Sequence, residues 1–211
     1  MLTLERARAW YTEPDTAHGF DHIERVYSLA RHLALEEKAD LEIVLAAAFL
    51  HDARGSTSGG EGRNDHHIRS AEFAVEILSA EGWEPERIAA VQHCIRAHRF
   101  RSRGEAPETL EARVLFDADK LDVLGAIGVA RTVAYAALAG QPIYIEPSIS
   151  FKETGEKEEG EPHSSYHEYL FKLSRIKDGL YTATGRAMAV ERHEYMEIYF
   201  QVLGAEIRGE R

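Results

Sequence analysis

The chain has 211 residues and is acidic, with 25 Lys and Arg against 36 Asp and Glu and a formal net charge of -11 at pH 7. Such a charge repels a polyanion, so we expect no binding to duplex nucleic acid. A small anionic substrate stays compatible with the charge, because a bound divalent cation can reverse the field locally.

The composition is that of a folded protein, since 44% of the residues are hydrophobic. The length fits one domain with a sizeable core. The lone Cys94 excludes an internal disulfide framework and a Cys-rich zinc site, and it fits a reducing compartment. No apolar run approaches the ~20 residues that a membrane helix needs. We therefore expect a cytoplasmic protein with no membrane segment.

The first strong pattern is an amphipathic helix over residues 21–37, where apolar side chains recur every three or four residues. Asp21 and Glu24 predict a capping box at its start. Residues 41–50 are apolar nearly all round, which predicts a helix in the middle of a bundle. The following residues 53–65 are rich in Gly, Ser and Asn and predict a loop.

Helical spacing resumes around residues 70–78 and again over residues 85–98, where Pro85 suits a first helical turn. A long helix is predicted over residues 110–138, with a bend or break around Gly125 and Gly128. Residues 140–162 combine prolines, glycines and charges and predict an excursion rather than a packed element. Two helices follow from Tyr166 onward, the second capped by Thr182 or Thr184. No strand pattern stands out, so the fold class is predicted to be all-α.

Eleven histidines are present, and several stand at the ends of predicted helices. Neutral imidazole at such a position can serve as a ligand for a transition metal. His51 and Asp52 follow the apolar helix, and alone this pair is weak support for a metal site. Its weight rises because His22 opens the preceding helix, and antiparallel neighbours bring the start of one helix beside the end of the next. His18 precedes that helix and is a less favoured ligand.

A fourth ligand is sought among Asp117, Asp119 and Asp122, which stand in an apolar stretch. Acidic groups in such a setting need a partner. Ordinary salt bridges to Lys120 or Arg113 are the alternative explanation for each of them.

These features together resemble the HD-domain superfamily of metal-dependent phosphohydrolases, whose signature is His, then His-Asp, then a distant Asp. The signature reads here HGFDHIERVYSLA, AAAFLHDA and LFDADKLDVLGAIGVAR. More narrowly, VQHCIRAHRF and TATGRAMAVER resemble segments of the small stand-alone bacterial HD hydrolases, so the likeness spans roughly residues 18–207. It implies one HD-type domain over residues 1–211, an all-α helical bundle with extra C-terminal helices. Its parts would be a metal-site core at about 18–135, a loop excursion at about 140–163 and C-terminal helices at about 166–207.

The resemblance assigns His22, His51, Asp52 and Asp119 as metal ligands and gives Asp52 a catalytic role as well. Further histidines would bind substrate or complete a second metal site. His93 and His98 are five residues apart on one helix and diverge by about 140°, so only one is expected to face the ion, and His98 is favoured. The weaker candidates of this kind are His66, His67 and His167.

The expected activity is hydrolysis of a phosphoester or phosphoanhydride, with a nucleotide as the small phosphorylated substrate. A nucleoside triphosphate cut to monophosphate and pyrophosphate is the reaction that the resemblance suggests. Imidazole and carboxylate ligands point to a divalent transition metal, with manganese favoured and Fe, Ni, Co or Zn as alternatives. Arg25 is the first choice for gripping phosphate, and Lys120 and Arg99 are further cations.

Two other functions stay open: a diiron HD-type oxygenase, and a non-catalytic nucleotide or metal sensor. A homodimer is also open. The segment after Asp52 lacks the acidic residue that some relatives carry there, which leaves the proton donor unnamed.

Overall fold

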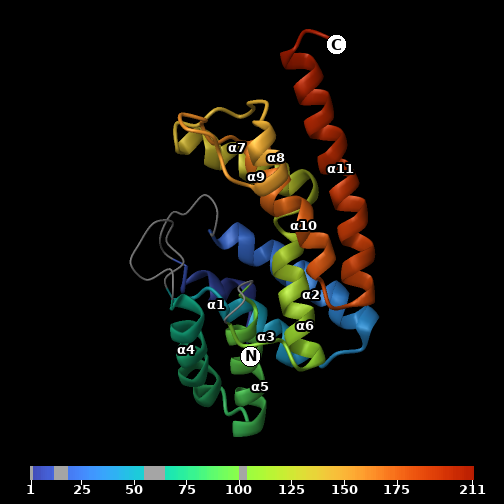
Figure 1. Cartoon of the computed structure of the whole chain (residues 1–211). Helices are drawn as coiled ribbons and strands as arrows, with labels where there is room; N and C mark the ends of the chain where they lie inside the picture. The colour runs from blue at the N-terminus through green and yellow to red at the C-terminus, as the bar shows by residue number, and fades with distance from the viewer. Residues whose placement is uncertain (1, 12–18, 55–64, 100–103) are drawn as a thin grey trace. The chain divides into compact units, whose positions relative to one another are not determined.

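A computed structural model describes residues 2–11, 19–54, 65–99 and 104–211 (Figure 1). These residues form helices joined by turns and contain no strand, so the prediction of an all-α protein is confirmed. The chain forms two compact units, Met1–Asp119 with Tyr181–Gly185, and Lys120–Leu180 with Arg186–Arg211. That the chain is one HD-type domain stays a prediction.

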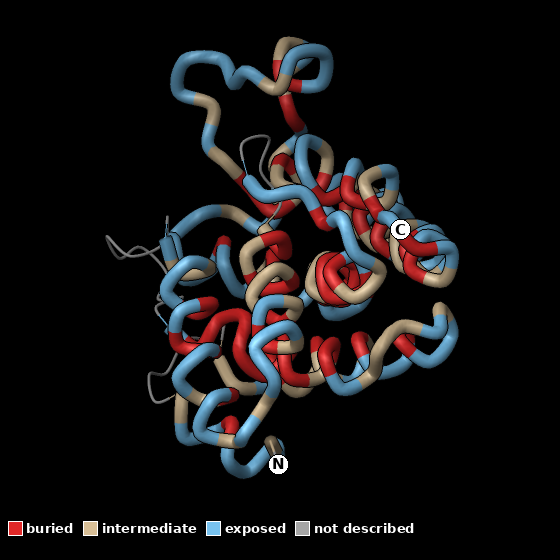
Figure 2. Tube along the Cα trace, turned by 90° about the horizontal axis from the view of Figure 1, so that it is seen from below, coloured by how far each residue is buried: buried red, intermediate tan, exposed pale blue. Residues whose placement is uncertain are grey.

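The first unit is a bundle built from α1 (Leu4–Arg8), α2 (Phe20–Glu37), α3 (Leu41–Leu50), α4 (His66–Ala80), α5 (Pro85–Ala97) and most of α6 (Leu110–Leu121). Helix α3 packs against α2, α4 and α5, and α4 lies along α5 (Figure 1). This explains why α3 is apolar nearly all round, since its neighbours cover several of its faces. Buried residues recur along the helices of this unit, as the red stretches of the tube show (Figure 2).

The helix starts differ in how they are capped. Asp40 caps α3, accepting hydrogen bonds from the backbone N–H groups of Glu42 and Ile43. The predicted capping box of α2 is wrong, because the helix begins one residue earlier, with Gly19 as its N-cap and no capping side chain. Asp21 instead lies inside the first turn, where its charge is favourable near the helix N-terminus. His18 and most of the predicted loop over residues 53–65 lie outside the described residues.

The long helix predicted over residues 110–138 is two helices, α6 and α7 (Gly125–Leu138). Gly125 is the first residue of α7 and has φ +70, a backbone conformation that favours glycine. Gly128 lies so close to the turn that a Cβ would stand 2.2 Å from the carbonyl oxygen of Val123. The break therefore lies at residues 122–124, just before the glycines that the sequence singled out.

The second unit contains α7, α8 (Ile149–Thr154), the helical run α9 (Ser165–Glu168), η2 (Tyr169–Leu173), α10 (Ser174–Ile176) and η3 (Lys177–Gly179), and most of α11 (Ala183–Ile207). The predicted excursion is wrong in part, because it contains α8 with a buried Phe151. Glu161 anchors this segment by accepting hydrogen bonds from the backbone N–H and hydroxyl of Ser148 and from His167 Nε2. These local bonds order a stretch whose composition alone suggested a loop.

Within the second unit, buried charges join α7 to its neighbours. Asp122 pairs with Arg131 on α7, and both side chains are largely buried. Arg192 on α11 donates to the backbone carbonyl of Leu121 and packs beside Gly125. A side chain at residue 125 would meet Arg192 Cγ at 3.0 Å, so the small residue permits this approach.

Asp117 on α6 anchors the start of α11 in the first unit. Its buried carboxylate accepts hydrogen bonds from the backbone N–H groups of Tyr181 and Thr182, at 2.9 and 2.7 Å, and from the hydroxyl of Thr182 at 2.6 Å. The same hydroxyl accepts from the N–H of Gly185, so the prediction of Thr182 as the cap is confirmed. A Cβ at Gly185 would lie 2.5 Å from Asp117 Oδ2, which explains the glycine.

Among the described residues, no single helix is long and apolar enough to cross a membrane; one helix pair with a sharp bend between its members, α6 with α7, meets the test jointly on length and composition alone.

Replacing Asp117 with alanine would leave the buried donors of Tyr181 and Thr182 without their acceptor. Because an unsatisfied buried donor costs roughly 1–3 kcal/mol, we expect a loss of about 3 kcal/mol in the free energy of unfolding. Urea denaturation followed by circular dichroism measures it. Glu76→Ala, at an exposed position of α4, is the control and should change stability by under about 0.5 kcal/mol. Equal stabilities of the two variants would contradict this role.

Candidate metal centre

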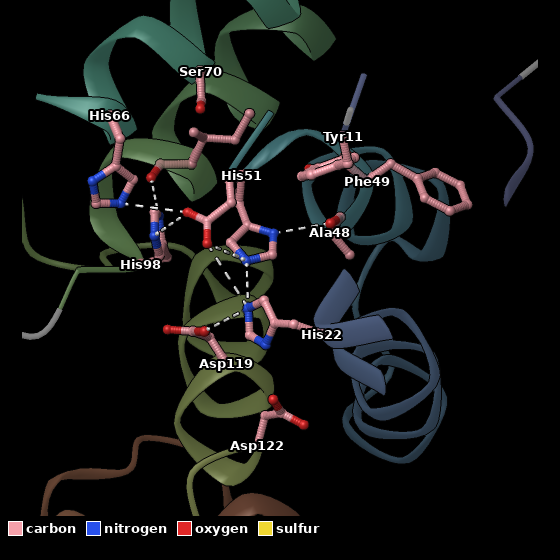
Figure 3. Close-up of polar contacts among 12 residues, drawn as sticks. Tyr11, His22, Ala48, Phe49, His51, His66, Ser70, His98, Asp119 and Asp122 are labelled. Carbon is pink, nitrogen blue, oxygen red and sulfur yellow. Dashed lines mark hydrogen bonds and ion pairs between the residues drawn. The ribbon is translucent and has the colours of Figure 1, made fainter. Parts of the chain in front are cut away.

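The ends of three helices meet at a cluster of imidazole and carboxylate groups (Figure 3). His22 comes from the first turn of α2, His51 and Asp52 directly follow α3, and Asp119 lies near the end of α6. His22 Nε2 lies 3.3 Å from His51 Nε2 and 3.4 Å from Asp119 Oδ1. Asp52 Oδ2 lies 3.9 Å from His22 Nε2 and 3.8 Å from His51 Nε2. The four residues of the sequence signature therefore converge.

A second group forms around the other oxygen of Asp52. His66 Nε2, from the first residue of α4, lies 3.4 Å from Asp52 Oδ1, and His98 Nε2, at the end of α5, lies 3.6 Å away. Two sets of three residues each are close enough to hold a metal ion, namely His22 with His51 and Asp119, and Asp52 with His66 and His98. Asp52 contacts both sets, with Oδ2 near His22 and His51 and Oδ1 near His66 and His98.

Two of the imidazoles are oriented by backbone carbonyl groups. His51 Nδ1 lies 2.9 Å from the carbonyl oxygen of Ala48, and His98 Nδ1 lies 2.5 Å from that of Ile95. A carbonyl oxygen only accepts, so each Nδ1 carries a proton, and a neutral ring in this tautomer presents the lone pair of Nε2 to the cluster. This is the arrangement in which histidine serves as a metal ligand.

The cluster is buried, and burial shifts the pKa values of its side chains. Burial, with a smaller contribution from the neighbouring His98 and His22, lowers the pKa of His51 to about 4 against the opposing effect of Asp52. Burial raises the pKa of Asp52, but the imidazoles of His51, His98 and His22 outweigh it and hold this pKa well below its usual range. At neutral pH, therefore, an ionised Asp52 lies beside a neutral His51.

This electron-rich arrangement fits a cation. Asp52 Oδ1 is buried and has no hydrogen-bond partner among the described residues, although two imidazole nitrogens lie within 3.6 Å of it. Ligand atoms held about 2.0–2.2 Å from one ion in tetrahedral geometry stand roughly 3.3–3.6 Å apart. The separations within each group are close to that range. The donor set, nitrogen with carboxylate oxygen, suits Mn, Fe, Co, Ni or Zn better than Mg.

The other residues singled out from the sequence do not belong to these two sets of potential ligands. His93 is engaged away from the cluster, with Nδ1 2.5 Å from Glu105 Oε1 and Nε2 accepting from the N–H of Glu108 at 3.2 Å. Arg25 pairs with Asp21 at 2.6 Å. Lys120 and His167 belong to the second unit, where His167 contacts Ser164 and Glu161.

His66 is the member of the cluster that the sequence analysis ranked low. The signal available was its position, because it is the first residue of a helix that directly follows the loop after Asp52. Sequence alone did not show that α4 starts beside the end of α3. Tyr11 was also missed, and its hydroxyl donates to the carbonyl oxygen of Phe49 at 2.8 Å in the last turn of α3 (Figure 3).

The sequence matches the model of the HD domain family over residues 19–124, a range that contains His22, the His51-Asp52 pair and Asp119. Together with the fold and this cluster, the match shows that the chain belongs to the HD-domain superfamily of metal-dependent hydrolases.

Among its relatives, the chain is similar to YpgQ of Bacillus subtilis, an uncharacterised protein, with 32% identity over 99% of this chain and 96% of that one. A crystal structure of YpgQ in complex with ADP superposes with a TM-score of 0.74 and 31% identity, covering 98% of this chain and 99% of that chain. An HD-superfamily hydrolase of Bacillus thuringiensis is 27% identical, with a TM-score of 0.70 and coverage of 97% and 94%. A predicted HD-superfamily hydrolase from an uncultured Thermotogales bacterium is 26% identical, with a TM-score of 0.64 and coverage of 96% and 90%.

The lowered pKa of His51 predicts how the stability of the metal-free protein depends on pH. The unfolded chain binds a proton at His51 below pH ~6.5, whereas the folded chain binds it only near pH 4. Stability is therefore full above pH ~6.5 and falls as the pH drops toward 4, by up to about 3 kcal/mol from this group.

Urea midpoints of chelator-treated protein between pH 7.5 and 4 measure this dependence. His51→Gln should show a shallower decline than the wild type, because its side chain does not titrate. His32→Gln, which changes an exposed histidine of α2, should keep the wild-type slope. Parallel curves for His51→Gln and the wild type would contradict the prediction.

Proposed function

We propose that this chain is a metal-dependent phosphohydrolase that cleaves a phosphoester or phosphoanhydride bond of a nucleotide. The observation that carries the proposal is the buried Asp52 carboxylate, whose two oxygens face two separate groups of imidazole nitrogens. Membership of the HD superfamily and the hydrolase descriptions of its solved relatives support it.

In this proposal His22, His51, Asp52 and Asp119 hold the first divalent ion. His98 and His66 would hold a second ion together with Asp52. The separations of 3.3–3.9 Å within the first group and of 3.4 and 3.6 Å within the second support this division. Manganese is the favoured metal, because it binds both imidazole and carboxylate ligands and also coordinates phosphate oxygens.

The chemistry that such an ion supplies is a lowered pKa of bound water and neutralisation of charge on the phosphoryl oxygens. The chain's own residues prepare the site for it. The carbonyl groups of Ala48 and Ile95 hold His51 and His98 in the tautomer that leaves Nε2 for binding. Asp52 stays ionised and can accept a proton from water that enters beside it.

A nucleotide is the proposed substrate because the solved relative YpgQ was crystallised with ADP and matches this chain along nearly its whole length. The reaction expected is cleavage of a nucleoside triphosphate to monophosphate and pyrophosphate. Arg25 is one helical turn after His22 on α2, close enough along the helix to reach a phosphate at the cluster once it leaves Asp21. Lys120 directly follows Asp119 and is a second cation for the same purpose.

Replacing Asp119 with alanine should remove one carboxylate from the first group while leaving α6 helical. Loss of a residue that only orients a metal ligand costs 10–100-fold in affinity or activity, so loss of a ligand should cost about 100-fold or more. Metal content by mass spectrometry and phosphate release from nucleotides measure the two effects. Asp178→Asn, on an exposed side chain of the second unit, is the control and should keep both. Unchanged metal content in Asp119→Ala would overturn the ligand assignment.

A screen of chelated protein reloaded with Mn, Fe, Co, Ni or Zn tests the activity itself. We expect turnover of nucleoside triphosphates with manganese, no turnover without metal, and pyrophosphate as the released product. Iron that copurifies with the protein, together with oxygen uptake by the iron-loaded protein, would favour a diiron oxygenase instead. Saturable nucleotide binding with no turnover under any metal would favour a sensor. Either result would overturn the phosphohydrolase proposal.

A further inference from the structure

Arg54 stands two residues after Asp52 and is fixed in place by α4. One face of α4 carries His66, Ser70 and Phe73, because residues four and three apart lie on the same side of a helix. His66 contacts Asp52, and Ser70 Oγ accepts a hydrogen bond from the backbone N–H of Arg54 at 3.1 Å. Asp52 and Arg54 therefore both contact this face of α4.

The side chain of Arg54 lies on the third member of that face. Its guanidinium carbon is 3.4 Å from the centroid of the Phe73 ring, and Trp10 packs edge-on against the same ring at 5.6 Å. Phe73 is buried and covers one face of the guanidinium, whereas Arg54 as a residue is exposed. An arginine stacked in this way is preorganised for a planar, two-point contact with an oxyanion.

Arg54 has no carboxylate partner within ion-pair distance in the part of the chain that is described; the side-chain hydrogen bond that it makes there goes to the carbonyl oxygen of Ala53 at 3.3 Å. Arg87 on α5 shows the contrast, since it pairs with both Asp40 and Glu42. In a chain with a net charge of -11, an arginine without such a partner beside the metal cluster is suited to an anionic ligand.

The position of Arg54 relative to the metal cluster follows from α4. Phe73 is seven residues beyond His66, which places it about 10 Å further along the helix axis. A guanidinium held that far along α4 suits a phosphate next to the one at the cluster.

We propose that Arg54 binds a second phosphate of the substrate, beyond the phosphoryl group at the metal centre, and so selects nucleoside di- and triphosphates over monophosphate esters. The contact is a charge-assisted, two-point hydrogen bond from the guanidinium to phosphate oxygens. This inference rests on the proposed phosphohydrolase function and names the substrate class of the same site.

Binding tests the inference without turnover. Calorimetry on manganese-loaded protein compares the methylene analogue of ADP, whose bridge between phosphates resists hydrolysis, with AMP. We expect Arg54→Gln to weaken the ADP analogue about tenfold, as for loss of one hydrogen bond to a charged group, and to leave AMP nearly unchanged. Arg31→Gln, an exposed arginine of α2, is the matched control and should bind both ligands as the wild type does.

Two further variants separate charge from geometry. Arg54→Lys keeps the charge without the planar fork and should recover only part of the lost affinity. Phe73→Leu keeps the arginine but removes the ring beneath it, and should weaken the ADP analogue by a smaller factor. Equal affinity of the wild type and Arg54→Gln for the ADP analogue, or an equal loss for AMP, overturns the inference.

Turnover separates this inference from the proposed function. In the wild type we expect kcat/KM to favour a nucleoside triphosphate over p-nitrophenyl phosphate, and Arg54→Gln should reduce that preference about tenfold. If Arg54→Gln hydrolyses both compounds with the wild-type preference, Arg54 does not bind the second phosphate, and the phosphohydrolase proposal is unaffected. If Arg54 is needed for selective binding of the ADP analogue but neither compound is hydrolysed, the phosphohydrolase proposal is wrong and the phosphate contact of Arg54 is retained.

Discussion

A carboxylate buried among imidazoles is the constraint around which the first unit is arranged. Asp52 is almost fully buried and ionised, and its oxygens face imidazole nitrogens rather than hydrogen-bond donors. Removing a charge from water costs several kcal/mol unless an opposite charge repays it. Because the surrounding imidazoles hold the pKa of Asp52 low, the folded chain keeps this carboxylate ionised, and binding of a cation to the folded form would add to its stability.

The side chains of this cluster come from helix ends, and the packing of the helices fixes where those ends lie. α3 is held by its neighbours on several sides, so the residues after its last turn have little freedom. The orphan carbonyl groups of helix ends are used as well, since those of Ala48 and Ile95 accept the Nδ1 protons of His51 and His98. Tyr11 satisfies a third, that of Phe49. The same backbone groups that would need capping anyway thereby orient the imidazoles.

The DADKLD stretch shows how three similar residues acquire different tasks. Asp117 binds the backbone at the start of α11, Asp119 lies 3.4 Å from His22, and Asp122 pairs with Arg131 in the second unit. Each carboxylate is required by a different neighbour, which accounts for so many acids in an apolar sequence. Asp122 does form a salt bridge, with Arg131, a partner that the sequence analysis did not name.

The sequence by itself determined the helices and the four signature residues. Apolar side chains repeating every three or four residues predict α2 and α3, and a helical hairpin brings His22 to His51 whatever lies around it. Gly125 and Gly128 likewise marked the break before α7 to within a few residues.

Only the tertiary structure decided the roles of His66, His93 and Arg54. His66 reaches Asp52 whereas His93 is engaged by Glu105, and the position of His66 at a helix start did not by itself separate the two. The burial of Phe73 beneath Arg54 depends in the same way on how α4 lies against the residues that follow α3. The physical reason is that periodicity reports which face of a helix is buried, whereas the partner of a polar side chain is set by whichever distant segment packs opposite it.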